Sequence, residues 1–410
     1  MTNTANGSEK RRIYFDHSAT TPVDKEVANA MLEYMTEKFG NASSVHAFGR
    51  EARKALEEAR EKVAALLNAE PKEIIFTSGG TESDNMLIKG IAYANRKKGN
   101  HIITSAIEHH AVLHTCEYLE KHGYKVTYLP VDENAMINIE DLKQAITAET
   151  ILVTIMFANN EVGTIQPIKE IGQLTREKGI IFHTDAVQVA GNYPIDVKEL
   201  NIDALSLSGH KFYASKGVGA SFLRKGIRIE ASQLGGSHER NLRAGTENVP
   251  GIVGLGKAAE IARRDMATKV ASITALRDKL IDGIFKIIPH VQLNGHPTQR
   301  MPGNVNFSFH YVEGESLLLN LDMRGIAASS GSACTSGSLD PSHVLLAMGL
   351  THEIAHGSLR ISLGRINTEA DIDYCLEVLP EILERLRSMS PLYGANRGVS
   401  ECNPCSKCRM

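Results

Sequence analysis

The chain has 410 residues, 42% hydrophobic and 23% charged, an ordinary globular composition that excludes a collagen-like or largely disordered protein. Its 45 basic and 48 acidic residues give a formal net charge of -3, so it lacks the basic excess that holds a nucleic-acid backbone. No apolar run approaches the roughly 18 residues of a membrane span. The polar stretch over residues 1–12 lacks the apolar centre of a secretory signal. We therefore expect a cytoplasmic protein with a disordered leader, no membrane association and no direct nucleic-acid partner.

Six cysteines in a chain of this length are too few for a disulfide scaffold. Three are isolated, at Cys116, Cys334 and Cys375, and the other three crowd the last nine residues. This pattern is typical of thiols in a reducing compartment.

Helical and strand patterns alternate through the first two-thirds of the chain. Apolar residues at helical spacing predict helices over residues 51–67, 81–98, 111–122, 139–146 and 168–178. Short apolar runs predict strands over residues 74–76, 101–104, 125–129, 151–157 and 180–183. The alternation predicts an α/β fold with a mostly parallel sheet, flanked by helices and joined by right-handed crossovers.

The last third of the chain has a different organisation. Residues 251–288 are almost continuously helical, and so long a helix after the sheet predicts a link between two domains. The residues after 288 predict a smaller α+β domain, with strands over 305–310, 326–328 and 359–363 and a last helix over 369–388. We expect a leader and N-terminal segment of the small domain over residues 1–17, a large domain over 18–265, a small C-terminal domain over 266–391 that carries the Cys334 loop, and a flexible Cys-rich tail over 392–410.

Ligands of an open parallel sheet bind at the carboxyl ends of its strands. After the strand at 74–76, residues 77–82 place two glycines and a hydroxyl at a helix N-terminus, which can form an anion site. A plain strand-to-helix turn would have the same sequence. No lysine follows the second glycine, so this is not the Gly-Lys-Ser/Thr nucleotide loop.

Two more polar side chains follow apolar strands. Asp185 could cap a helix or pair with a protonated ring nitrogen, and the amine of Lys211 could form a Schiff base in a desolvated position. A lysine, a strand-end aspartate and a glycine-rich phosphate turn together fit pyridoxal 5'-phosphate. That cofactor needs an imine partner, a pyridinium partner and a phosphate site.

The sequence closely resembles the cysteine desulfurases, the NifS/IscS-like branch of pyridoxal-phosphate enzymes with the aminotransferase-type fold. The resemblance runs from about residue 13 to residue 392. The motifs that carry it lie at residues 14–22, 77–83, 108–109, 159–163, 185–188, 208–211, 243–246 and 329–334.

The resemblance implies a set of site residues in the large, cofactor-binding domain. Lys211 would carry the cofactor and move protons at the substrate α-carbon, Asp185 would hold the pyridine nitrogen protonated, and His109 would stack on the ring as a candidate acid–base group. Further implied cofactor contacts are Gln188 and Asn160 near the ring, Gly80, Thr81, Ser208 and His210 at the phosphate, and Thr246 from the partner subunit of a homodimer. Implied substrate-carboxylate contacts are Asn160, Arg360 and Asn41.

The chain departs from the family pattern in two turns. Ala214 and Ser215 replace a Gly-Pro pair, and Ala42 replaces a proline, so both turns are expected to be less rigid. Lys216 is a rival for the cofactor lysine, but it occupies the Lys-Gly pair that follows the family's catalytic lysine.

Residues 329–338 contain no large apolar side chain, which predicts a mobile loop around Cys334. An incidental surface thiol would look the same. The resemblance implies a nucleophile that takes sulfur from L-cysteine as a persulfide, releases L-alanine, and passes the sulfur to an iron–sulfur scaffold or another acceptor protein.

Other interpretations remain open. Selenocysteine lyase or another pyridoxal-phosphate transferase would share the same fold. His352, Glu353 and His356 match the zinc-protease helix motif literally, although glycines bracket the segment closely and no third ligand follows at metzincin spacing. His110 and His114 have metal-ligand spacing on a helix, but an exposed helix face explains them as well.

The last cysteines, Cys402, Cys405 and Cys408, are the feature that the family explains least. Three thiols at this spacing can reach one soft metal ion or a cluster, or relay sulfur from Cys334. A solvated tail whose thiols have no function is the alternative.

Overall fold

The computed structural model describes residues 12–330, 341–391 and 393. Cys334 and residues 331–338 of the predicted loop lie outside the described residues, as do most of the leader and tail with Cys402, Cys405 and Cys408. The first residue of that loop, Ser329, is described, and its backbone pairs with that of Arg360.

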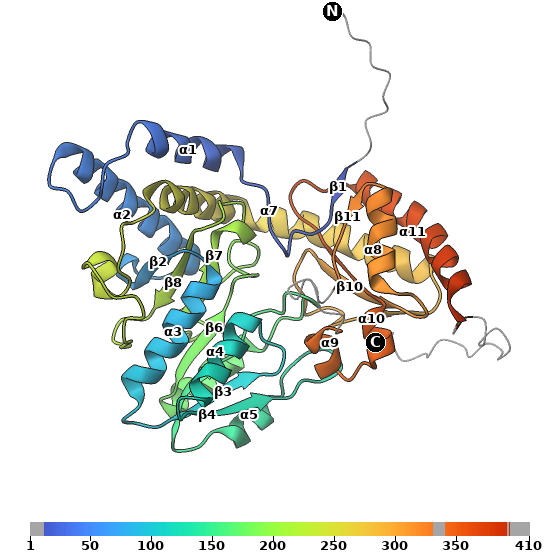
Figure 1. The fold of residues 1–410 in the computed structure, drawn as a ribbon, viewed down its shortest axis with the longest axis horizontal. Helices are drawn as coiled ribbons and strands as arrows, with labels where there is room; N and C mark the ends of the chain where they lie inside the picture. The colour runs from blue at the N-terminus through green and yellow to red at the C-terminus, as the bar shows by residue number, and fades with distance from the viewer. Residues whose placement is uncertain (1–11, 331–340, 392, 394–410) are drawn as a thin grey trace, which may run out of the picture.

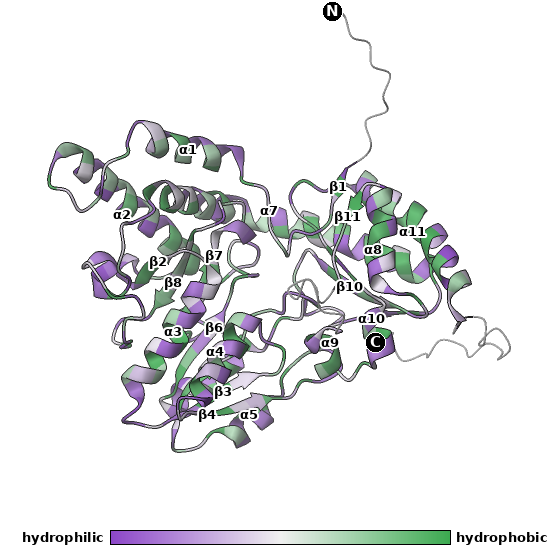
Figure 2. Cartoon of the chain, in the orientation of Figure 1, coloured by the Kyte–Doolittle hydropathy of each residue, from purple (hydrophilic) through white to green (hydrophobic). Residues whose placement is uncertain are grey.

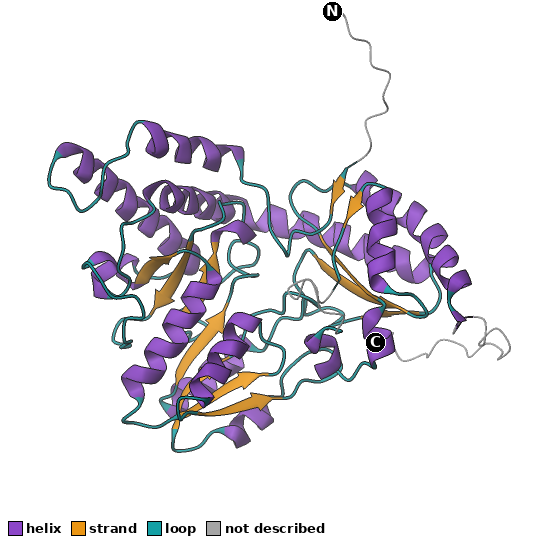
Figure 3. Ribbon diagram, viewed as in Figure 1, coloured by secondary structure: helices purple, strands orange, loops and turns teal. Residues whose placement is uncertain are grey.

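A seven-stranded sheet in the order β2-β8-β7-β6-β5-β3-β4 forms the centre of the larger body (Figure 3). Its strands are β2 (Ile74–Thr77), β3 (His101–Ser105), β4 (Lys125–Leu129), β5 (Thr150–Thr154), β6 (Ile181–Asp185), β7 (Ala204–Ser208) and β8 (Gly219–Leu223). Strand β8 is antiparallel to both β2 and β7, and every other pairing is parallel. All strands except β8 therefore end at the same edge. The predicted mostly parallel sheet is confirmed.

Helices cover this sheet and carry the connections between its strands (Figure 1). They are α1 (Lys25–Thr36), α2 (Ala47–Leu67), α3 (Gly80–Asn95), α4 (His110–Glu120), α5 (Ile139–Ala145) and α6 (Ile168–Lys178), with short turns η1 (Pro71–Glu73), η2 (Gly209–Lys211) and η3 (His238–Asn241).

Element boundaries shift where local hydrogen bonds decide them. Helix α2 begins at Ala47, four residues before the predicted start, because the side chain of His46 accepts a hydrogen bond from the Gly49 N–H. Strand β5 ends at Thr154, earlier than predicted. The extended chain beyond it still donates from the Phe157 N–H to the Asp185 carbonyl.

Helix α7 (Val249–Ile287) is continuous over 39 residues and joins the larger body to a smaller one (Figure 1). In the smaller body, β10 (Asn304–Phe309) lies between β9 (Val291–Leu293) and β12 (Ser358–Ser362), and β1 (Ile13–Tyr14) pairs with β11 (Ile326–Ala327). Its helices are α8 (Gly314–Met323), α9 (His343–Ala347), α10 (His352–His356) and α11 (Glu369–Met389).

Four hydrophobic clusters hold the described residues together, and the two largest lie one in each body. The larger contains the inner faces of α2, α6 and the first half of α7 against the sheet. The second contains the far half of α7 and α11, together with Ile13 and Phe15 from the start of the described chain. Helices α8 and α11 mix hydrophobic and hydrophilic residues, as expected of helices with one buried face (Figure 2). None of the described helices combines the length and apolar character needed to cross a membrane.

A buried ion pair fixes the edge strand β2. The Nη1 and Nη2 atoms of Arg60 each lie 2.8 Å from an oxygen of Glu239, and Nη1 also donates to the Ile74 carbonyl. Glu239 accepts a further hydrogen bond from the Phe76 N–H at 2.9 Å. Because both charged groups are buried, each depends on the other for compensation.

We expect Glu239→Leu to lower the free energy of unfolding by about 3–5 kcal/mol, because it leaves the buried Arg60 charge with only the half-exposed Glu57, 3.3 Å from its Nε, as a partner. Equilibrium urea unfolding measures the change. Arg60→Met combined with Glu239→Leu should recover part of the loss, since no charge remains buried. Lys54→Met, which removes an exposed pair with Glu58, is the control and should cost less than about 1 kcal/mol. Equal effects of Glu239→Leu and the control would contradict the prediction.

Candidate active site

A cavity of about 360 Å³ lies at the edge of the sheet where the parallel strands end. Volumes of roughly 300–1,000 Å³ are typical of sites for small molecules and cofactors. The segments that follow β2, β3, β5, β6 and β7 all reach it, because parallel strands bring their carboxyl ends together.

The cavity brings together most of the side chains that the sequence singled out. Its lining includes Gly80, Thr81, His109, Asn160, Asp185, Gln188, Ser208, His210, Lys211 and Arg360. Asn41 and Thr246 are exposed and do not line it, and the Asn41 side chain accepts a hydrogen bond from the Ser43 N–H.

Several lining residues were not proposed from the sequence. They are Ser18, Ala19, Asp84, Met156, Ala158 and Val187. Ser18 and Ala19 belong to the motif at 14–22, and Asp84 follows Gly80 by one helical turn, so the spacing of Asp84 offered a signal. No local sequence motif indicates that Met156 and Ala158 line the cavity, because their position depends on where β5 ends.

The N-terminus of α3 forms a cradle suited to an anion. The helix starts at Gly80 after Gly79, and no side chain of the described residues caps its N-terminus from the capping position. A Cβ at Gly80 would lie 2.5 Å from Val187 Cγ2, so only glycine fits this close approach. Uncapped amides at the positive end of a 16-residue helix fit the phosphate of the implied cofactor.

Lys211 lies in η2, directly after β7. Its Nζ donates to the Ser18 carbonyl at 2.5 Å and to the Ala19 carbonyl at 3.0 Å. Gln188 also donates to the Ser18 carbonyl, at 3.0 Å. The segment around Ser18 therefore covers the cavity and holds the lysine amine inside it.

Asp185 ends β6 and is 7% exposed. Its Oδ1 accepts from the Val187 N–H at 2.8 Å, and burial raises the pKa of its carboxyl to about 6. The carboxyl of Asp84, also buried, has its pKa raised by burial and by the charge of Asp185. A cation beside Asp185 would stabilise its ionised form, and a protonated pyridine nitrogen has that charge.

His109 caps the N-terminus of α4. Its Nδ1 accepts from the Ala111 N–H at 3.1 Å, which places the ring proton on Nε2. Burial and the neighbouring charge of Lys211 lower the pKa of His109 to about 4. The ring is therefore neutral at physiological pH and can stack on an aromatic cofactor.

His210 and Arg360 complete the lining from two sides. The His210 Nδ1 lies 3.1 Å from Thr20 Oγ1, and burial lowers the pKa of His210 to about 4. Arg360 in β12 is 2% exposed and contacts Asp16 Oδ1 at 3.0 Å and the Asn160 carbonyl at 3.2 Å. Its Nε is buried and has no hydrogen-bond partner within the described part of the chain, so at least one of its five N–H donors remains for a ligand carboxylate.

The histidines of the alternative metal interpretation lie elsewhere. His352 and His356 are the ends of α10, which has only five residues. Among the described residues, no group of three His, Cys, Asp or Glu side chains is arranged to hold a metal ion. The rings of His110 and His114 stack with centroids 5.1 Å apart.

Comparisons with known proteins agree with this geometry. The model of the Aminotransferase class-V family matches residues 13–375. The cysteine desulfurase IscS of Methanosarcina thermophila is 61% identical over 385 residues, which are 94% of this chain and 95% of that protein. A solved NifS-like protein has a TM-score of 0.86 and 41% identity, covering 92% of this chain and 100% of that one. A structure described as SspA in complex with cysteine has a TM-score of 0.78 and 38% identity, covering 87% and 100%.

We expect Gly80→Ala to weaken binding of pyridoxal phosphate about tenfold or more, because overpacking against Val187 costs about 1–3 kcal/mol. Titration of the cofactor-free protein with pyridoxal phosphate measures the affinity. Adding Val187→Ala should restore it, since the clash is with that side chain. Unchanged affinity in Gly80→Ala would show that the close approach is no constraint on the cradle.

Proposed function

The chain belongs to the pyridoxal-phosphate-dependent cysteine desulfurases of the IscS/NifS type, within the class-V aminotransferases, and on that basis we propose how its residues act. The protein converts L-cysteine to L-alanine, holds the sulfur as a persulfide on Cys334, and passes it to an acceptor. The observation that carries this proposal is the single cavity that joins Lys211, Asp185, His109 and Arg360.

Different cavity residues would contact the ring and the phosphate of the cofactor. Lys211 would form the covalent link, Asp185 would pair with the ring nitrogen, His109 would stack on the ring, and Gln188 would contact the ring oxygen. The α3 cradle at Gly80 and Thr81 would hold the phosphate, together with Ser208 and His210. Pyridoxal phosphate, when bound, supplies an electron sink for charge that develops on the substrate.

The remaining side chains orient the substrate. Arg360 offers its unpartnered Nε to the carboxylate of L-cysteine, assisted by Asn160. The exposed Asn41 would join them only if its segment moved toward the cavity. Lys211 then exchanges protons at the substrate α-carbon, and the neutral His109 is suited to give or accept a proton nearby.

Cys334 receives the sulfur. Its thiolate attacks the substrate sulfur, so that an S–S bond forms while the C–S bond of cysteine breaks. The bonding pair of the C–S bond and one proton remain with the three-carbon product, which leaves as alanine. The persulfide on Cys334 carries the sulfur to an iron–sulfur scaffold or another acceptor protein.

We also propose a homodimer. Apolar side chains are exposed on α1, the start of α2 and the segment between them: Leu32, Met35, Phe39, Val45 and Phe48 are between 53% and 89% exposed. Such a patch is typical of a protein interface. Thr246 lies outside its own cavity and would reach the phosphate of the partner subunit. A monomer in sedimentation equilibrium would contradict this.

We also propose a division into two domains, a cellular location and a role for the tail. The two largest hydrophobic clusters support a large domain over residues 18–265 and a small one over 1–17 and 266–391, which native-state hydrogen exchange would detect as two protected units. Free buried thiols at Cys116 and Cys375 support a cytoplasmic location, testable by cell fractionation.

The tail cysteines Cys402, Cys405 and Cys408 would bind metal or relay sulfur. Truncation after residue 396 should then slow transfer to an acceptor but not alanine formation.

Lys211→Ala should lose the covalent link to the cofactor and at least 1,000-fold in alanine formation, since no other amine lines the described cavity. Borohydride reduction followed by peptide mapping locates the link. Lys216→Ala is the matched control and should retain both the link and turnover. Labelling of Lys216 in the Lys211→Ala variant would refute the assignment.

Cys334→Ser should keep the cofactor spectrum and still bind L-cysteine, yet form alanine at less than about 1% of the normal rate, because a hydroxyl is a far weaker nucleophile than a thiolate. Alanine and sulfide are measured in parallel. The buried Cys375→Ser is the control for thiol loss elsewhere and should retain turnover. Full turnover by Cys334→Ser would end the nucleophile proposal.

A further inference from the structure

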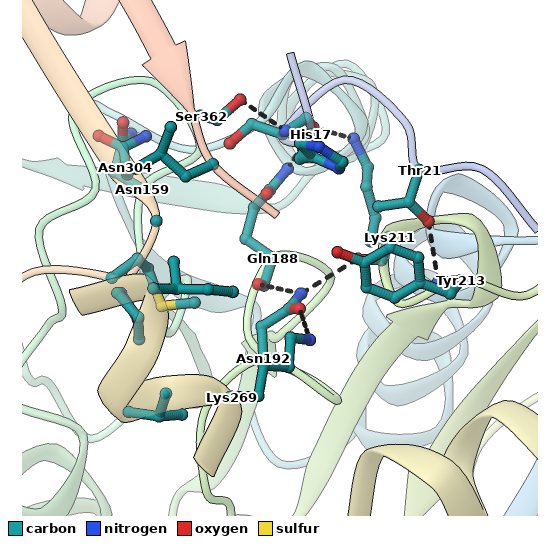
Figure 4. A pocket seen from close by; sticks show the side chains of 17 residues that line it. His17, Thr21, Asn159, Gln188, Asn192, Lys211, Tyr213, Lys269, Asn304 and Ser362 are labelled. Carbon is teal, nitrogen blue, oxygen red and sulfur yellow. Dashed lines mark hydrogen bonds between the residues drawn. The ribbon is translucent and has the colours of Figure 1, made fainter. Parts of the chain in front are cut away.

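A second cavity adjoins the cofactor site at Lys211, and Figure 4 shows the side chains that line it. Ser18, Gln188 and Lys211 line both cavities. The second has a volume of about 50 Å³, room for a few water molecules but far below the roughly 300 Å³ of a small-molecule site. This cavity is therefore too small for a second substrate, and its distinguishing feature is the set of side chains that meet there.

Lys269 of α7 reaches the main chain of Lys211 through one intervening side chain. Its Nζ donates to Asn192 Oδ1 at 2.7 Å and to the Gly191 carbonyl at 3.0 Å. The Asn192 Nδ2 in turn donates to the Lys211 carbonyl at 3.1 Å and to the Gln188 carbonyl at 3.2 Å. Figure 4 shows this series of bonds from Lys269 to Asn192 and on toward Lys211 and Gln188.

Lys269 also contacts Tyr213, two residues after Lys211. The Lys269 ammonium lies 5.1 Å from the centre of the Tyr213 ring, and the Arg365 guanidinium lies 3.7 Å from it. Tyr213 has φ of +72°, which costs a residue with a side chain about 1–2 kcal/mol. Its N–H donates to Thr21 Oγ1 and its hydroxyl accepts from the Arg365 N–H. Such a conformation persists only where several contacts hold it, and the two cations are among them.

The charge of Lys269 is costly where it lies. No acidic side chain within the described part of the chain forms an ion pair with it, although the charge of Asp265, which pairs with Arg264, acts to raise its pKa. The ionisable groups that face it are His17, Asp24, Lys211, Tyr213, Asp265 and Arg365. Burial, followed by the charge of Arg365, lowers the pKa of Lys269 to about 7. The hydrogen bonds to Asn192 and the Gly191 carbonyl offset part of the cost of placing this charge here, so a gain in stability is not enough to account for a lysine.

We propose that Lys269 is a positioning residue, which fixes the turn carrying Lys211 against α7 through Asn192 and the ring of Tyr213. Because α7 joins the two bodies, this contact sets the position of the Lys211 amine relative to the helix that also leads to the small body. The inference rests on the proposed role of Lys211 and adds the residues that orient it.

The test compares Lys269→Met with Lys257→Met in the cofactor-loaded enzyme. Lys257 lies on the same helix and pairs with Glu26 and Glu260 at the surface, so it is a matched loss of a lysine. The readouts are the pH midpoint of the cofactor's visible absorption, which reports on its link to Lys211, and kcat and KM for L-cysteine. Lys269→Met should move the midpoint by at least half a pH unit and lower kcat about tenfold, with KM changed less than twofold. Its melting temperature should equal or exceed that of the wild type.

Three further variants test whether Lys269 acts on Lys211 through Asn192: Lys269→Arg, Asn192→Ala, and the double variant Asn192→Ala with Lys269→Met. Lys269→Arg retains a charged donor and should restore the midpoint. Asn192→Ala should reproduce the effect of Lys269→Met, and the double variant should add nothing, because both break the same series of bonds. Additive effects would overturn the route through Asn192.

A midpoint and kcat in Lys269→Met equal to those of Lys257→Met would overturn the proposal as a whole. So would a fall in melting temperature without any change in the midpoint, since that is the signature of a purely structural lysine. Failure of the proposed function gives a different result, because Lys211→Ala would then retain the borohydride-reducible link whatever the Lys269 variants do.

Discussion

The common direction of strands β2, β3, β5, β6 and β7 is the constraint on which the site depends. Parallel hydrogen bonding brings their carboxyl ends to one edge, where five loops from distant parts of the sequence converge. The antiparallel strand β8 preserves this common direction, because it lies between β2 and β7 and pairs antiparallel with both, so that β2 and β7 run the same way.

Burial of charge gives the site its chemical character. Asp185, Asp84 and Glu108 are buried carboxyls, and burial raises the pKa of each. The same desolvation keeps His109 and His210 neutral. Together these effects produce a cavity that favours a cationic ring nitrogen beside Asp185, an anion at the α3 N-terminus and a carboxylate at Arg360. Pyridoxal phosphate with an amino-acid substrate has that distribution of charge.

Two connections tie the larger body to the smaller one at Lys211. The segment around Ser18 leaves β1 in the smaller body, covers the cavity and accepts hydrogen bonds from the lysine amine. Helix α7 approaches from the other side and reaches the Lys211 main chain through Lys269 and Asn192. Lys211 is therefore held at both its amine and its backbone, through elements that also belong to the second core. The proposed positioning role of the partly buried Lys269 rests on this double anchorage.

Sequence patterns alone were enough to predict the α/β class, the long α7 helix and the strand-end positions of Asp185 and Lys211, because hydrophobic periodicity and local turn residues act over a few neighbours. The motifs also identified the family. The same patterns did not reveal β8, whose Gly-Ala-Ser stretch has little strand character. Nor did they reveal the buried Asp84, the contact of Ser18 with Lys211, or the series of bonds from Lys269 to Asn192. These features emerge only in the folded chain, because desolvation and hydrogen bonding between residues tens to hundreds of positions apart depend on how the strands and helices pack, and no local pattern encodes that packing.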